Sequence, residues 1–107
     1  MSGPWAYASR LENYLLNNAG KGPYCTRRTW FNDASVEDNS LYPGDVVFQH
    51  LSKNSDAFHT LAISESGGKN RAIYCAHSSA VRSGSLYARI HKNKSLYFRG
   101  LNLQYRN

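Results

Sequence analysis

The N-terminal part of the chain shows the hydrophobic spacing of an amphipathic helix. Apolar side chains recur three or four positions apart, at Trp5, Ala8, Leu11 and Leu15, and Tyr14 and Leu16 widen the same stripe. Pro4 suits a first helical turn, and Gly20 is a common residue just past a helix end. The spacing therefore predicts a helix from about Trp5 to Asn18, whose apolar stripe packs into the core.

Between residues 20 and 42 this periodicity is lost. The segment is rich in Gly, Asn, Asp and Ser, which is typical of a loop. We expect Trp30 and Phe31 to tuck beneath the loop as a small apolar cluster of their own. Because so long a loop is uncommon in a compact domain, it should either be functional or contain a short helix.

From Asp45 onward, apolar and polar residues alternate, as they do in half-buried strands. The alternation predicts strands at 45–50, 58–64 and 71–77 and a last strand from Leu96 to Leu103. Gly67 to Asn70 suits a hairpin turn, and Ser85 to Lys92 fits either a short helix or another strand. The order predicts an α+β fold, a single domain over residues 1–107 with an N-terminal helix packed on a four- to five-stranded antiparallel sheet.

The composition shows that the chain is basic, and the sequence lacks the patterns of several classes of protein. The 107 residues include 13 Lys and Arg against 7 Asp and Glu, for a net charge of +6. A basic domain can bind RNA, DNA, an anionic membrane or an acidic wall polymer, and scattered basic residues predict weak, non-specific, salt-sensitive binding. The sequence shows no apolar stretch of membrane-spanning length, no signal-peptide pattern and no set of ligands at zinc spacing. It predicts no membrane span, no metal site and no cofactor.

Two histidines adjoin the predicted hairpin and are candidates for catalysis. His59 opens one strand and His77 ends the next, so neighbouring strands would carry a general base and the group that orients it toward a cysteine nucleophile. Of the two cysteines, Cys75 lies in an apolar run and is expected to be structural, which leaves Cys25 as the nucleophile candidate in this chain. A disulfide between them is allowed but not required. His50 and His91 adjoin polar stretches and are expected at the surface.

A set of short motifs resembles a known family. In order along the chain these are Trp5, Tyr14-Leu15, Pro43-Gly44-Asp45-Val46, His59-Thr60, His77-Ser78, Arg82 and Ser85-Leu86. This order, over nearly the whole chain, is similar to the amidase-like domain family of bacteria, relatives of the NlpC/P60 and CHAP cell-wall hydrolases among the papain-like cysteine peptidases and amidases.

The resemblance implies a papain-like half-domain that acts on, or binds, a cell-wall peptide or a related amide. It implies that His59 is the base and His77 its orienting partner. Its candidate substrate-binding residues are Asp45, Trp30, Ser78 and Arg82. A secreted or cell-envelope location would follow from the family.

The chain also departs from the family pattern. Members carry the nucleophilic cysteine in an Asp-Cys motif upstream of the Trp-led helix, and no such motif precedes Trp5. Phe58 stands where an aspartate often precedes the histidine, and Ser83 and Gly84 separate Arg82 from Ser85-Leu86, a slight shift from the usual spacing. We therefore expect one of three cases: the C-terminal part of such a domain, whose nucleophile comes from an upstream segment or a partner chain; a degenerate domain that binds without cutting; or a domain in which Cys25 has taken over as the nucleophile.

Two other classes of protein fit the same residues. A small metal-independent ribonuclease or toxin domain would use His59 and His77 as paired base and acid, with Lys and Arg stabilising the phosphate and the eight tyrosines stacking on bases. A non-catalytic interaction module would use the segment 20–42 as its contact surface.

Overall fold

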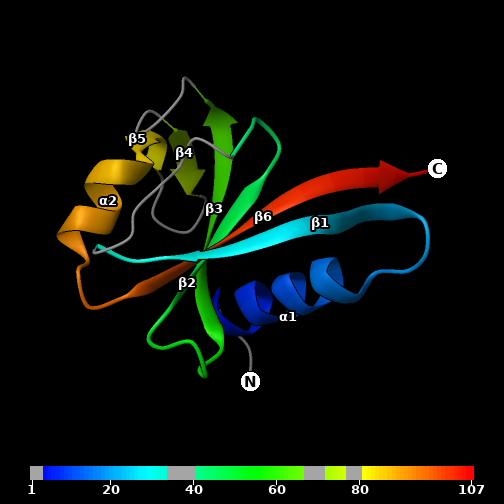
Figure 1. Cartoon of the computed structure of the whole chain (residues 1–107), viewed down its shortest axis with the longest axis horizontal. Helices are drawn as coiled ribbons and strands as arrows, with labels where there is room; N and C mark the ends of the chain where they lie inside the picture. Colours follow the sequence, from blue (N-terminus) through cyan, green and yellow to red (C-terminus); the bar gives the residue numbers. More distant parts are fainter. Residues whose placement is uncertain (1–3, 34–40, 67–71, 77–80) are drawn as a thin grey trace.

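A twisted antiparallel sheet forms the body of the molecule. The computed structural model describes residues 4–33, 41–66, 72–76 and 81–107, and for residues 4–7, 76 and 81–83 it describes the backbone alone. The described elements are α1 (Pro4–Asn17), β1 (Gly22–Phe31), β2 (Val46–His50), β3 (Ala57–Glu65), β4 (Ile73–Ala76), β5 (Val81–Ser85), α2 (Leu86–Lys92) and β6 (Tyr97–Arg106). The sheet order is β1-β6-β2-β3-β4-β5, with antiparallel neighbours throughout. In Figure 1, β1 and β6 run as a long ribbon across the direction of β2 and β3, which shows the strong twist of the sheet.

The expectation of a four- to five-stranded sheet is wrong, because the described residues form six strands. The predicted loop over 20–42 is also wrong, since β1 occupies part of it. A register shift between Cys25 and Arg27 breaks the period-two alternation of β1, and Pro23 is tolerated because β1 lies at the sheet edge. The predicted fold was a four- to five-stranded sheet with one N-terminal helix, as a papain-like half-domain. The structure instead has a six-stranded sheet with one helix on each face.

The segment 85–92, which fitted either a helix or a strand, contains α2. Ser85 is its N-cap, and the Ser85 hydroxyl accepts a hydrogen bond from the backbone N–H of Ala88 at 3.2 Å. The cap satisfies one of the N–H groups that a helix start leaves without an intrahelical partner. A serine four residues before Arg89 thus fixes where α2 begins.

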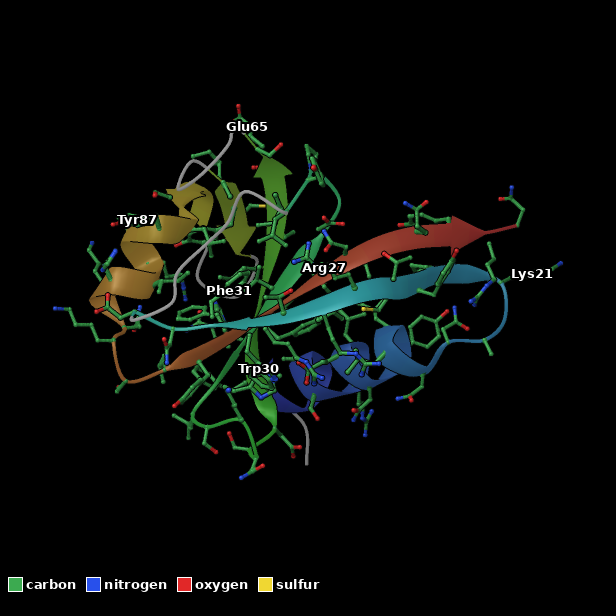
Figure 2. The ribbon with its side chains drawn as sticks, in the orientation of Figure 1. Lys21, Arg27, Trp30, Phe31, Glu65 and Tyr87 are labelled. Carbon is green, nitrogen blue, oxygen red and sulfur yellow. The ribbon has the colours of Figure 1, made fainter. Side chains whose placement is uncertain are left out.

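The two faces of the sheet carry separate hydrophobic cores, because side chains alternate along each strand. The core under α2 includes Phe31, Leu41, Val47, Leu61, Ile63, Tyr74, Leu86, Ile90 and Phe98. The core under α1 includes Ala8, Leu15, Phe48, Ala57 and Leu101. Figure 2 shows the neighbours Trp30 and Phe31 on opposite sides of β1, Trp30 toward α1 and Phe31 toward α2. These two sides are called the α1 face and the α2 face below.

The buried stripe of α1 differs from the predicted one. Ala8 and Leu15 are buried, but Leu11 is 40% exposed and Tyr14 is 48% exposed, so the expectation that these two pack into the core is wrong. Glu12, only 5% exposed, takes a place in the buried stripe. Residues 8, 12 and 15 follow the three-to-four spacing of one helix face, and α1 therefore carries a carboxylate into the α1 face.

Candidate active site

His59 lies on the α2 face of the sheet, near the start of β3. Its backbone pairs with Gln49 of β2, and the next pair along these strands is Leu61 with Val47. Leu61 and Val47 belong to the core under α2, so alternation places the side chains of His59 and Gln49 on the same face. Gln49 is only 2% exposed, whereas His59 is half-buried. His59 therefore lies at the edge of this core, with the Nε2 atom of its imidazole shielded from solvent.

Arg89 of α2 connects the helix to the sheet on this face. Its Nε donates a hydrogen bond to Gln49 Oε1 at 2.7 Å, and its Nη1 donates to the Tyr74 hydroxyl at 2.9 Å. The guanidinium also lies over the Tyr74 ring, 5.2 Å from the ring centre. A buried amide and a phenol thus fix a planar cation in one orientation, for which arginine is better suited than lysine.

The surroundings of His59 favour its neutral form. Burial lowers the pKa of His59, and the positive charge of Arg89 lowers it further. A neutral imidazole has a nitrogen lone pair that can accept a proton, which a general base at neutral pH requires. Position and electrostatics together make His59 the best candidate for a base among the described residues.

Neither cysteine of the sequence lies on the His59 face. Cys25 packs against the core under α1, its thiol donates to the Arg27 carbonyl oxygen at 3.2 Å, and burial raises its pKa. Cys75 pairs with Ala62, which alternates with Leu61 and therefore points to the α1 face. The structure does not bring Cys25 and His59 together. A raised pKa also makes Cys25 a poor thiolate at neutral pH.

Asp45 has structural hydrogen bonds for both carboxylate oxygens. Oδ2 accepts from the Tyr42 backbone N–H at 2.9 Å and from Asn102 Nδ2 at 2.7 Å, and Oδ1 accepts from the Leu103 N–H at 2.9 Å. These bonds attach the turn before β2 to β6. Gly44, whose φ is 96°, supplies the left-handed residue that this turn needs. A role for Asp45 in substrate binding stays a prediction.

Trp30 belongs to the α1 face, together with a buried histidine. Its ring meets the ring of His50 edge-on at 4.8 Å, and the Arg99 guanidinium lies 4.9 Å from the Trp30 ring centre. Trp30 is half-buried and points toward α1 (Figure 2), whereas strand pairing places His59 on the α2 face. The structure does not place these two candidate residues at one site.

The remaining predicted site residues lie outside what the structure describes. His77 and Ser78 fall in residues 77–80, and only the backbone of Arg82 is described, within β5. The pairing of β3 with β4 does bring the strand before His77 next to the strand of His59. The predicted partnership of His59 and His77 stays a prediction.

The expectation that His50 lies at the surface is wrong, because it is only 3% exposed. Its Nδ1 donates to the Ser55 carbonyl oxygen at 2.8 Å, and its Nε2 lies 2.7 Å from Glu12 Oε2. Burial acts to lower the pKa of His50, but the hydrogen bonds to Glu12 and Ser55 and the Glu12 charge outweigh it, so the pKa is raised. His91, in contrast, is partly exposed and forms an ion pair with Asp33.

Gln49, Tyr74 and Arg89 were not predicted from the sequence as site residues. Gln49 offers the one usable signal, because it follows the apolar run Val46-Val47-Phe48 at an inward position of the predicted strand. A buried polar side chain requires a partner, and here the partner is Arg89. No pattern pointed to Arg89 itself.

Comparison with known proteins identifies the family. Residues 1–100 match the family model described as "Putative amidase domain". The chain belongs to this family. Neither the search of curated proteins nor the search of solved structures gave a match. Among the described residues, neither helix is long and apolar enough to cross a membrane.

Proposed function

We propose that this chain supplies the general base of an amide-hydrolysing site and that His59 is this base. The observation that carries the proposal is the position of His59 on the α2 face, half-buried and opposite Gln49, with the fixed charge of Arg89 nearby. Membership of the amidase family supplies the reaction class. The charge of Arg89 keeps the resting imidazole neutral and therefore ready to accept a proton.

The proposed reaction uses a thiol that these 107 residues do not provide on the His59 face. Cys25 and Cys75 point to the α1 face, so the thiol comes from a further segment of the polypeptide or from another chain. His59 removes the thiol proton, and the sulfur attacks the amide carbonyl carbon. The C–N bond breaks, the amine leaves with the proton from His59, and water then hydrolyses the thioester. The substrate class is a cell-wall peptide or a related amide, and the net charge of +6 would favour an acidic polymer.

Hydrolysis of peptide amides by the natural protein, purified with any segments or chains that accompany this one, tests the proposal. His59→Gln should lower kcat/KM by at least about 100-fold, the usual contribution of a general base. His91→Gln is the matched control, because His91 is also half-buried but lies on α2 in an ion pair with Asp33. The double variant Cys25→Ser/Cys75→Ser should keep most of the activity. Loss of activity in the double variant, or an unchanged rate in His59→Gln, would contradict the proposal, as would the absence of any amide hydrolysis.

A further inference from the structure

A hollow of about 380 Å³ lies beside α2, between the helix and the strands at the end of the sheet. Tyr74, Gly84, Ser85, Arg89, Lys92 and Asn93 line it. Among the described residues that line it, Arg89 and Lys92 are basic and none is acidic. The hollow therefore has a positive electrostatic potential and attracts anionic groups.

The hydrogen-bonding capacity of Arg89 is only partly used. A guanidinium carries five N–H donors, of which Arg89 donates one to Gln49 and one to Tyr74. No other hydrogen bond joins its side chain to the residues that the structure describes, so donors remain for a ligand. The Tyr74 hydroxyl accepts from Arg89 and the Ser85 hydroxyl accepts from Ala88, and each keeps its own proton to donate. The hollow thus offers hydrogen-bond donors and two positive charges. Both are complementary to an anionic group that only accepts hydrogen bonds.

We propose that this hollow binds a carboxylate of the substrate, and that the substrates are amides that carry a free carboxylate close to the bond that is cleaved. This inference rests on the proposed function. A carboxylate can accept two parallel hydrogen bonds from one guanidinium, and the bonds to Gln49 and Tyr74 hold Arg89 ready for this. Arg89 lines the hollow and donates a hydrogen bond to Gln49, which pairs with His59 across β2 and β3, so a group held by Arg89 would lie near the amide that His59 serves.

The same geometry couples carboxylate binding to the base. The positive charge of Arg89 lowers the pKa of His59 in the free protein. A carboxylate bound to Arg89 would offset this charge, and the pKa of His59 would then rise toward its ordinary value. Substrate binding would strengthen His59 as a base, and a pKa change at His59 gives a readout that does not depend on catalysis.

A titration followed by NMR tests the inference on the chain itself, without turnover. The probes are N-acetylglycine, which carries a carboxylate, and its neutral analogue N-acetylglycinamide. N-Acetylglycine should shift the backbone amide signals of Ala88, Lys92 and Asn93 in a saturable way and should raise the pKa of His59. The neutral analogue should bind at least about tenfold more weakly, because it cannot form charge-assisted hydrogen bonds. Equal binding of the two probes would overturn the inference.

Variants identify the residues that hold the probe. Arg89→Gln should abolish saturable binding. Lys92→Gln changes an exposed side chain and should weaken binding severalfold without affecting the fold. Lys94→Gln, an exposed lysine that does not line the hollow, is the control and should bind as the wild type does. Binding that Arg89→Gln and Lys92→Gln leave intact, or that Lys94→Gln weakens as much, would overturn the assignment.

Further outcomes distinguish a carboxylate site from a phosphate site, and this inference from the proposed function. Inorganic phosphate that binds more tightly than N-acetylglycine would overturn the carboxylate assignment. Amide hydrolysis that depends on His59 but shows no preference for a carboxylate-bearing substrate would overturn this inference and leave the proposed function standing. Selective carboxylate binding in a protein that hydrolyses no amide would overturn the proposed function and leave the carboxylate site standing.

Discussion

Glu12 Oε2 lies 2.7 Å from His50 Nε2, and this contact joins α1 to β2 where both side chains are almost fully buried. His50 also donates to the Ser55 carbonyl oxygen, so both ring nitrogens are engaged. With a raised pKa, His50 is the protonated partner of the Glu12 carboxylate in mildly acidic solution. A charged pair this well buried is sensitive to the loss of either partner.

Glu12→Ala should therefore lower the free energy of unfolding by about 3 kcal/mol at pH 6, because it leaves a buried imidazolium without its counter-charge. Urea denaturation monitored by circular dichroism measures this change. The control is Glu65→Ala, which removes an exposed glutamate at the end of β3 and should have an effect of about 0.5 kcal/mol or less. Equal effects of the two substitutions would show that the contact between Glu12 and His50 contributes little.

The raised pKa of His50 predicts how stability depends on pH. The folded state holds the proton more tightly than the unfolded state, whose histidine titrates near 6.5. The stabilisation is thus fully present below pH 6.5 and is lost as the pH rises through the folded-state pKa of His50. In His50→Gln this contribution is absent, so the stability difference between wild type and variant should shrink from pH 6 toward alkaline pH. A difference that grows over this range would contradict the assignment of charge.

Asp45→Asn tests whether this carboxylate is structural. The substitution replaces one acceptor oxygen with an NH₂ group among three donors, from Tyr42, Asn102 and Leu103, and should cost about 1–3 kcal/mol of stability. Asp56→Asn, at an exposed position, is the control. Thermal melts of both variants give the comparison. If Asp45→Asn is as stable as wild type, the carboxylate is free to serve the substrate, as the sequence predicted.

Gly84→Ala should displace the Tyr74 ring and so disturb the hydrogen bond between Tyr74 and Arg89. An added Cβ would come within 2.8 Å of the Tyr74 ring, so the ring must move, and overpacking of this kind costs about 1–3 kcal/mol. Because Tyr74 bonds Arg89, the pKa of His59, measured by NMR, should shift as well. Gly100→Ala is the matched control, since it crowds Phe31 and Leu41 and should destabilise the fold without this shift. An unchanged His59 pKa in Gly84→Ala would argue against the connection through Tyr74.

The sequence predicted those parts of the fold that local patterns encode. Strands were expected at 45–50, 58–64 and 71–77, and β2, β3 and β4 lie within these segments or close to their limits. Apolar spacing placed a helix over 5–18, where α1 runs from Pro4 to Asn17. In β1 the alternation fails at a register shift and at adjacent arginines, so its pairing with β6 had no local signature.

The polar network was beyond sequence-based prediction because it joins residues that are distant along the chain. Glu12 and His50 lie 38 positions apart, and Arg89 and Gln49 lie 40 apart. His59 could be singled out because it opens a strand in a family motif. Cys25 lies across the sheet from His59 because β1 pairs with β6, and no local pattern in the sequence determines this pairing.

The rate at which iodoacetamide alkylates Cys25 and Cys75 near pH 7, measured separately by mass spectrometry, tests the central claim most directly. If both thiols lie across the sheet from His59, each should react no faster than an ordinary cysteine with a pKa of about 8.5, and Cys25 should react more slowly because burial raises its pKa. His59→Gln and the control His91→Gln should then both leave these rates within about twofold of wild type, since neither imidazole activates a thiol. A cysteine that alkylates more than about tenfold faster than a free thiol, and that slows in His59→Gln but not in His91→Gln, would contradict the account by showing a thiolate–imidazolium pair within this chain.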